Sequence, residues 1–164
     1  MADGTIGNEA IARPNNANAG YTTIVYQNAA SKSGKLYKVD LFTSNIKAAP
    51  QSGKIKVFRE VGANFVQVGS SYAITSALEG LNTYTLSTPI DVLVGDYIAW
   101  WTVPTNYIYC DITTTGGSCY FYNGDVSGTL AKASWTANAW IPSIYGYIKP
   151  PSAGGMGFGN PMIF

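Results

Sequence analysis

The sequence predicts an all-β protein: an antiparallel β-sandwich, with a jelly roll as the favoured topology. Apolar and polar side chains alternate with a period of two, as where Tyr37, Val39 and Leu41 are separated by Lys38 and Asp40. This period is typical of strands with one buried and one exposed face. Clusters of Gly, Ser and Asn separate the alternating segments, and no long helical pattern connects them.

The alternation continues along the chain and predicts about ten strands. Ile55 and Val57 form the apolar side of one strand, and Tyr84 and Leu86 form that of another. In chain order, the expected strands lie near residues 7–13, 21–27, 35–43, 54–60, 65–73, 82–88, 94–103, 107–112, 118–123 and 140–148.

Turn-forming clusters mark the boundaries between these strands. Helix is expected only as a single turn within residues 127–134, and no repeat of 20–50 residues is present. The clusters lie at residues 28–34, 48–53, 62–64, 78–82 and 113–117.

The composition limits the classes of function. The chain has 164 residues, enough for one domain with a substantial core. Its net charge is +1, which argues against the basic surface that nucleic-acid binding needs. Charged residues make up 12%, about half the usual share, while Gly, Tyr and Trp number 18, 12 and 4. A surface of hydroxyls, amides and rings favours an extracellular or assembled particle.

The sequence lacks several of the residue combinations on which catalytic sites are commonly built. Histidine is absent, so triads of Ser-His-Asp or Cys-His type and a facial metal triad are unavailable. The nine acidic residues show no pairing along the sequence of the kind that glycoside hydrolysis uses. We therefore expect a protein that is not an enzyme and that holds no cofactor and no metal.

Targeting and membrane segments are not expected either. No apolar run approaches the roughly 20 residues of a membrane-spanning helix. The start of the given chain, residues 1–5, lacks the basic and apolar regions of a secretory signal. Neither a membrane nor a nucleic acid is expected as a partner.

The segments 107–112 and 118–123 are expected to pair as a hairpin around the loop at residues 113–117. In the register that matches their apolar faces, Cys110 lies opposite Cys119 on the core side. A cross-strand disulfide and a pair of buried reduced thiols are the two alternatives. Two cysteines without histidine do not complete a tetrahedral metal site.

The other face of this hairpin is expected to gather four tyrosines into one patch. Such rings offer a large rigid contact area with a polar tip, which suits a subunit contact or stacking on a sugar. The alternative is an ordinary solvent-facing strand surface with high β-propensity. The residues of the patch are Tyr107, Tyr109, Tyr120 and Tyr122.

The pair Trp100-Trp101 is the second conspicuous aromatic feature. Consecutive side chains of a strand point to opposite faces, so one indole is expected inside the core and the other outside it. Trp101, as a candidate for the outer position, would anchor a partner or ligand, or would be covered by the loop at residues 135–140.

The last fifteen positions differ from the rest, which predicts a sandwich domain at residues 1–149 and a tail at residues 150–164. Pro150 and Pro151 stiffen the exit from the domain, and a glycine-rich run follows. The tail is too apolar for an inert linker, so we expect it to pack on its own domain or on a neighbouring subunit. Its apolar residues are Met156, Phe158, Met162, Ile163 and Phe164.

Five short motifs occur in order between residues 6 and 147, and together they resemble a group of β-sandwich domains common in phage and metagenomic sequences. Each motif alone is typical of strand and turn chemistry. They are Ile6-Gly7-Asn8-Glu9-Ala10-Ile11; Asn28-Ala29-Ala30 with Gly34, Leu36 and Val39; Val57-Phe58 with Gly62, Asn64 and Phe65; Val94-Gly95-Asp96-Tyr97-Ile98; and Ile144-Tyr145-Gly146.

The resemblance implies a structural domain of a virion or extracellular particle and brings no catalytic residues with it. The chain departs from the group at Ala99-Trp100-Trp101, where the group has Gly and a smaller aromatic residue, and in its apolar tail. Both departures suggest an added contact surface.

These observations lead to an expected function and two alternatives. The first is a non-enzymatic structural protein of a phage-like virion, located in the virion or an extracellular particle. It would decorate the capsid or, second, belong to the tail or fibre, and would contact itself or other virion proteins. The alternatives are a carbohydrate-binding module that uses a surface Tyr/Trp patch on a glycan, and a subunit of an extracellular filament.

Overall fold

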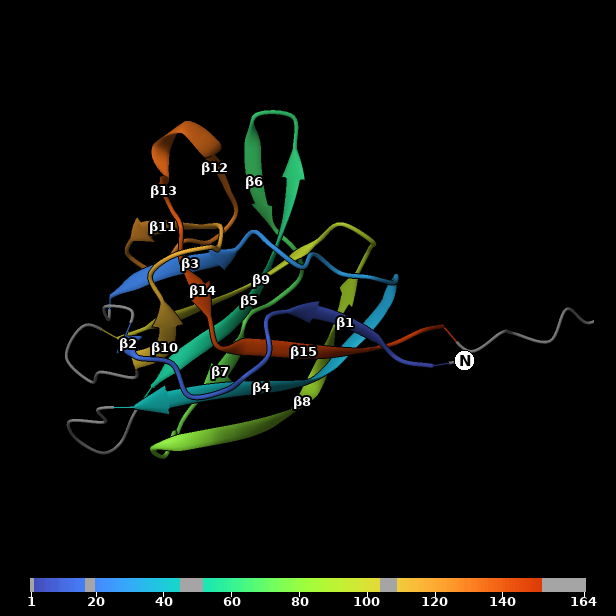
Figure 1. The fold of residues 1–164 in the computed structure, drawn as a ribbon. Helices are drawn as coiled ribbons and strands as arrows, with labels where there is room; N and C mark the ends of the chain where they lie inside the picture. Colours follow the sequence, from blue (N-terminus) through green and yellow to red (C-terminus); the bar gives the residue numbers. More distant parts are fainter. Residues whose placement is uncertain (1, 17–19, 45–51, 104–108, 152–164) are drawn as a thin grey trace, which may run out of the picture.

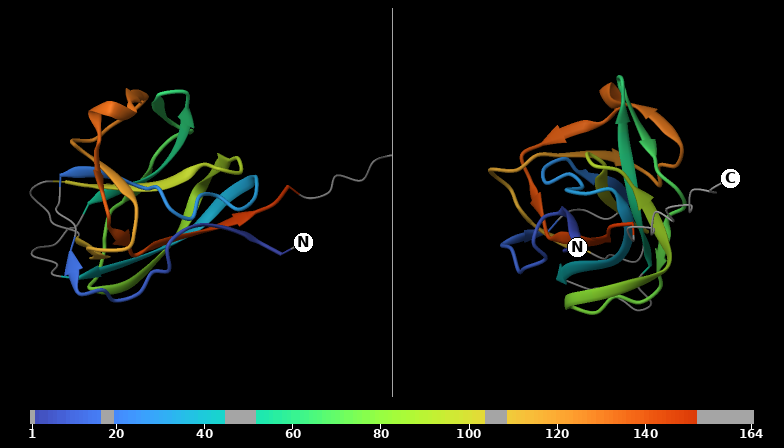
Figure 2. Two further views of the ribbon diagram at one scale, coloured as in Figure 1. Left: turned by 45° about the horizontal axis from the view of Figure 1, so that its top comes forward. Right: turned by 90° about the vertical axis from the view of Figure 1, so that its right-hand side faces the viewer.

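The computed structural model describes residues 2–16, 20–44, 52–103 and 109–151. In these residues the chain forms strands β1 to β15, arranged in two antiparallel sheets that pack face to face (Figures 1 and 2). The predicted all-β sandwich is confirmed, while its jelly-roll connectivity stays a prediction.

One sheet has seven strands. Its long central strand β4 hydrogen-bonds to β15 on one edge and to β8 on the other, and β1 pairs with the free edge of β15. The short strands β2 and β14 both pair with β10, which continues the sheet beside the end of β4. The strands are β1 (Gly4–Gly7), β2 (Asn15–Asn16), β4 (Gly34–Ser44), β8 (Gly80–Val92), β10 (Tyr109–Thr113), β14 (Ile141–Pro142) and β15 (Ile144–Lys149).

The other sheet has eight strands in the order β12-β6-β5-β9-β3-β11-β13, with β7 also paired to β5. A single 3-10 turn, η1 (Lys132–Ser134), lies between β12 and β13, within the segment where one helical turn was expected. The strands are β3 (Tyr21–Val25), β5 (Gly53–Val61), β6 (Asn64–Gln67), β7 (Tyr72–Ile74), β9 (Tyr97–Thr102), β11 (Cys119–Asn123), β12 (Thr129–Ala131) and β13 (Thr136–Asn138).

The main core lies between the two sheets. Val39 and Leu41 of β4 face Ile55 and Val57 of β5 across the sandwich, and all four side chains are fully buried. Trp100 is 1% exposed in the same core, as the alternation along β9 predicts. Packing is tight enough that a methyl group added to Gly146 of β15 would lie 2.6 Å from side-chain carbons of Ile6 and Leu36.

Residues of three of the five sequence motifs are joined by backbone hydrogen bonds. Gly7 donates its backbone N–H to the carbonyl of Asn28, and the backbone of Ala30 bonds to that of Gly95 and Asp96. The Asp96 carboxylate, 1% exposed, accepts two hydrogen bonds from the Arg59 guanidinium at 2.7 and 2.8 Å and one from a backbone N–H. The motif residues therefore fix turns, as their chemistry predicts.

Several strand boundaries differ from the expectation. The first strand is Gly4–Gly7 rather than 7–13, because Gly7 adopts a φ of +84° and turns the chain away from the sheet. The expected strand 65–73 is two strands, β6 and β7, separated by a turn at Gly69 with a φ of +60°. Strand β8 runs from Gly80 to Val92 and is longer than the expected 82–88.

The predicted hairpin of 107–112 with 118–123 is wrong. Strand β10 lies in the seven-stranded sheet, whereas β11 lies in the other sheet, with β3 on one edge and β13 on the other. Both edges of β11 are therefore occupied, and the chain crosses between the sheets through residues 114–118. Gly117 permits this crossing, since a Cβ there would lie 2.0 Å from the carbonyl oxygen of Trp140.

The substitution Leu41→Ala is expected to destabilise the protein by about 2–5 kcal/mol, because it removes a fully buried side chain and leaves a cavity between the sheets. The same truncation at Leu78, whose side chain is 75% exposed, is expected to cost under about 0.5 kcal/mol. Urea unfolding of both variants measures the difference. Equal losses at the two positions would contradict the position of the core.

Candidate functional site

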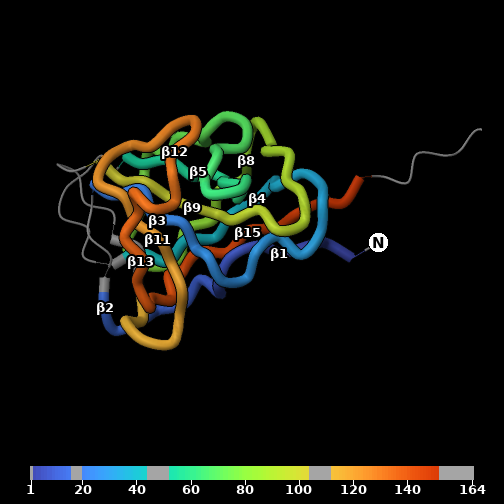
Figure 3. The backbone as a smooth tube through the Cα atoms, turned by 90° about the horizontal axis from the view of Figure 1, so that it is seen from above, coloured from blue at the N-terminus to red at the C-terminus, as the bar shows by residue number. Residues whose placement is uncertain are grey.

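The outer face of the eight-stranded sheet is covered by the chain itself. Residues 124–138, which we call the cover segment, include η1 and the two edge strands β12 and β13 of this sheet, and they curve over part of this face (Figures 1 and 3). Beneath it lies a second apolar cluster, separate from the core between the sheets. We call it the covered cluster: Ile24, Phe58, Phe65, Ala99, Val126 and Trp135, with Tyr26, Tyr97, Tyr120, Tyr122 and Leu130 packed against it.

Lys132 holds the middle of the cover segment on the sheet. Its ammonium donates to Glu60 and to the Tyr26 hydroxyl, both at 2.8 Å, and lies 4.3 Å from the Tyr26 ring centroid and 5.1 Å from that of Tyr120. The hydrogen bonds from Lys132 and Tyr26 hold the pKa of Glu60 below its usual value. Charge, hydrogen bonding and cation–π attraction thus act together on one side chain.

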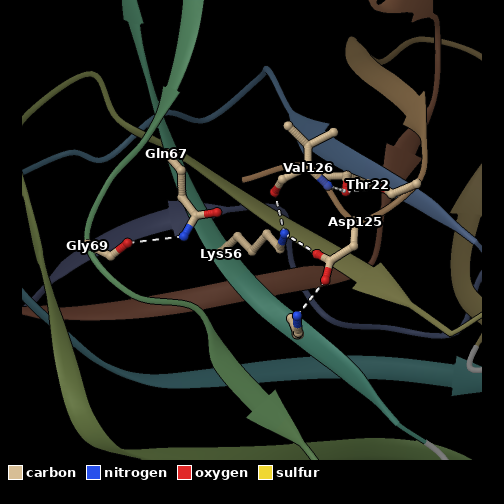
Figure 4. A network of polar contacts seen from close by, with 8 residues as sticks. Thr22, Lys56, Gln67, Gly69, Asp125 and Val126 are labelled. Atoms are coloured by element: carbon tan, nitrogen blue, oxygen red, sulfur yellow. Dashed lines mark hydrogen bonds and ion pairs between the residues drawn. The ribbon is translucent and has the colours of Figure 1, made fainter. Parts of the chain in front are cut away.

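A second lysine holds the start of the cover segment. Lys56 of β5 is 1% exposed, and its ammonium donates to the Asp125 carboxylate and to the Val126 carbonyl (Figure 4). Lys54 binds the other oxygen of Asp125, and the Thr22 hydroxyl accepts the Val126 backbone N–H at 3.0 Å. Burial lowers the pKa of Lys56, so its charge depends on these acceptors.

The predicted four-tyrosine patch is wrong as an open surface. Tyr120 and Tyr122 are half-buried in the covered cluster, where Tyr120 contacts Tyr26 edge-on at 4.9 Å between centroids. Tyr109 belongs to a strand of the opposite sheet, and Tyr107 lies outside the described residues. The hairpin face on which the patch was predicted is therefore not formed.

Other predicted site residues have mixed outcomes. Trp101 lies on the face of β9 opposite Trp100, as expected, but it is half-buried, with the Lys54 ammonium 5.2 Å from its ring centroid. Residues 152–164, which include the predicted assembly residues Met156, Phe158, Met162, Ile163 and Phe164, lie outside the described part of the chain.

Of the two alternatives for the cysteines, the structure has the reduced thiol at Cys119. Cys119 is buried and free, and its strand does not pair with β10, so the cross-strand pairing that a disulfide with Cys110 required is absent. Burial raises the pKa of the Cys119 thiol to about 11. Cys119 therefore behaves as a small apolar side chain.

The outer face of the seven-stranded sheet carries an open groove with a volume of about 500 Å³. Asp40 of β4 lies in its floor, directly opposite Tyr145 of β15. Tyr147 follows two residues later on the same side of β15, because alternate side chains share a face. The groove is lined by Glu9, Ala10, Asp40, Leu81, Tyr145 and Tyr147.

Hydrogen bonds fix the groove carboxylate in place. The Tyr147 hydroxyl donates to one oxygen of Asp40 and the Thr83 hydroxyl to the other, each at 2.7 Å. The bond to Asp40 raises the pKa of Tyr147 to about 12. Each carboxylate oxygen retains a second lone pair, so Asp40 can accept further hydrogen bonds from a ligand.

The aromatic rings of the groove are arranged at right angles. The Tyr145 and Tyr147 centroids are 5.0 Å apart with an interplanar angle of 82°. The Lys38 ammonium lies 3.6 Å from the Tyr147 centroid. The groove thus combines aromatic surface, carboxylates and one amine on a rigid sheet.

The sequence analysis missed this groove, although a signal for it was present. Tyr145 and Tyr147 alternate with buried Ile144 and Ile148, so the period of two assigns both tyrosines to one outer face. What the sequence did not reveal is that β15 pairs with β4 and brings Asp40 beside them.

Among the residues that the structure describes, no group of three or more His, Cys, Asp or Glu side chains could hold a metal ion. The described part of the chain also contains no helix long and apolar enough to cross a membrane. No protein-family model, curated protein or solved structure matches this chain.

We expect Asp125→Asn to cost about 1.5–3 kcal/mol, because it leaves the buried Lys56 ammonium without a charged partner. Lys56→Met is expected to be near neutral, since it removes the charge that needs this partner. In the Lys56→Met background, Asp125→Asn should then cost much less. Chemical denaturation of the four proteins measures the coupling.

A matched control for this cycle is Lys54→Met, which removes the more exposed lysine on the same carboxylate and is expected to cost under about 1 kcal/mol. Additive effects of Asp125→Asn and Lys56→Met would contradict the role of their ion pair.

In a Cys110→Ser variant, Cys119 is expected to resist a maleimide reagent at pH 8 in the folded protein and to react fully in denaturant, because it is buried with a raised pKa. Unfolded wild-type protein without reductant should titrate two thiols, one for each cysteine of the sequence. Rapid labelling of the folded variant, or no thiols in the unfolded wild type, would contradict this assignment.

Proposed function

We propose that this chain is a non-enzymatic structural domain of a phage-like particle, which presents the outer face of its seven-stranded sheet to other molecules. The observation that carries the proposal is the difference between the two outer faces. The cover segment covers the central part of one face, where its aromatic and apolar side chains, Lys132 and Asp125 contact the sheet. The other retains an open groove.

Exposed apolar side chains beside the groove support a contact surface there. Leu81 is 58% exposed at the groove and lies opposite Phe42 in the pairing of β8 with β4. Leu78 is 75% exposed, and its carbonyl accepts a hydrogen bond from Thr43 at the same end of β4. Burying such side chains contributes about 25 cal/mol per Å², which favours association that tolerates salt.

Composition supports the non-enzymatic and particle parts of the proposal. Without histidine the chain cannot build the commonest acid–base and nucleophilic machinery. A charged fraction of 12% and a net charge of +1 leave little electrostatic steering toward nucleic acid or acidic partners. Capsid decoration is the first form of the proposal, and a tail or fibre component is the second.

Light scattering tests assembly on the full chain and on a version that ends at Pro151, each at low and high salt. We expect a defined, salt-tolerant oligomer for the full chain, because its apolar tail and groove face both offer surface to bury. The truncated protein should be a folded monomer, with an unchanged far-UV spectrum as the control. Full chain and truncation that are both monomeric would contradict self-assembly, and an oligomer lost at high salt would contradict its apolar basis.

A further inference from the structure

We propose that the groove on the seven-stranded sheet binds a neutral saccharide through Tyr145, Asp40 and Glu9. This inference rests on the proposed function in one respect, since it assigns a ligand to the face that we propose as the contact surface. It differs from the sugar-binding hypothesis of the sequence analysis, because that hypothesis placed the sugar on a hairpin face that the structure does not form.

The shape of the site suits a small ligand. The groove of about 500 Å³ falls within the range of about 300–1,000 Å³ that is usual for small-molecule sites. Its floor is formed by paired strands, where Asp40 of β4 lies opposite both Tyr145 and Thr83. A site on strands holds its side chains more precisely than one built on loops.

The polar groups suit a ligand that donates hydrogen bonds. Both oxygens of Asp40 are already oriented by Tyr147 and Thr83 at 2.7 Å, so the carboxylate is held in position before a ligand arrives. Glu9 adds a second, exposed carboxylate at the rim. Sugar hydroxyls are donors that such acceptors bind well, because hydrogen bonds to ionised acceptors are the stronger ones.

The apolar groups suit a ligand with a carbon–hydrogen face. Tyr145 and Leu81 contribute aromatic and aliphatic surface beside the carboxylates. Leu81 is 58% exposed in the free protein, so a ligand that covers it removes apolar area from water. A pyranose ring presents apolar carbon–hydrogen groups on its faces and hydroxyls around its edge, which matches this division.

The charges of the groove select against anionic ligands. Two carboxylates, Glu9 and Asp40, repel an anion. The ammonium of Lys38, 3.6 Å from the Tyr147 centroid, already occupies the cation–π position on that ring, so this ring is not free to bind a cationic ligand. A neutral polyhydroxylated molecule avoids the repulsion by the carboxylates and can donate its hydroxyl hydrogens to them.

The experiment titrates the full chain by calorimetry with three neutral probes: cellotetraose, mannotetraose and the N-acetylglucosamine tetramer. A heparin tetrasaccharide and tetralysine serve as anionic and cationic probes. We expect at least one neutral probe to bind, and to bind more tightly than either ionic probe. Absence of binding by all three neutral probes, or tighter binding of an ionic probe, would overturn the proposal.

Variants locate the binding. Tyr145→Ala and Asp40→Asn should each weaken binding by about tenfold or more, whereas Tyr145→Phe keeps the ring and should keep the affinity. Tyr37→Ala is the matched control, since Tyr37 lies on the same strand as Asp40 but bonds to Asp3 outside the groove. Thermal unfolding shows which variants remain folded. If Tyr145→Ala does not fold, the single variants Asp40→Asn and Tyr145→Phe test the site, with weaker binding expected only for Asp40→Asn. Unchanged affinity in folded Tyr145→Ala or Asp40→Asn would place the sugar elsewhere and refute the site.

Light scattering in the same samples separates this inference from the proposed function. Assembly without sugar binding refutes only the saccharide site. Sugar binding by a chain that stays monomeric supports the site and counts against self-assembly.

Discussion

Burial of the central part of the eight-stranded sheet on both faces constrains the rest of the molecule. Its inner face packs on the other sheet through Ile55 and Val57, and its outer face carries Phe58 and Lys56 beneath the cover segment. Lys56 lies on the covered part of this face, where its ammonium is out of reach of solvent, so it requires Asp125. The outer face of the seven-stranded sheet carries the open groove around Asp40.

Much of the sandwich follows from short-range patterning. The alternation around Val39 and Leu41 correctly assigned the buried side of β4, because the side-chain period of a strand is a local property. The cover segment has no such pattern, and it is held by contacts between residues far apart in sequence, such as Lys132 with Glu60 and Asp125 with Lys56. Propensity and periodicity do not report these pairings, so residues 124–138 were expected to contribute only one helical turn.

Which of the candidate site residues come together depends on which strands pair, and residue types alone do not determine this pairing. Tyr120 and Tyr122 were correctly placed on one face of a strand, but whether that face is open depends on a segment that folds back over it. The hairpin prediction assumed that neighbouring strands pair, whereas β10 and β11 belong to different sheets. Tyr145 and Asp40 are about a hundred positions apart in the chain, and only the pairing of β15 with β4 joins them.

The existence of two separate apolar cores has a consequence for the dynamics of the chain. The contacts that close the covered cluster, centred on Lys56 and Lys132, are distinct from those that join the sheets. An opening of the cover segment as a sub-global unit would break these contacts and the pairings of β12 with β6 and of β13 with β11, while β4, β5 and β9 could stay protected from amide exchange. Such an opened form would expose Tyr26, Phe65 and their aromatic neighbours on an intact sandwich. The lysine contacts and these two strand pairings thus oppose an opening that would leave apolar surface free to aggregate.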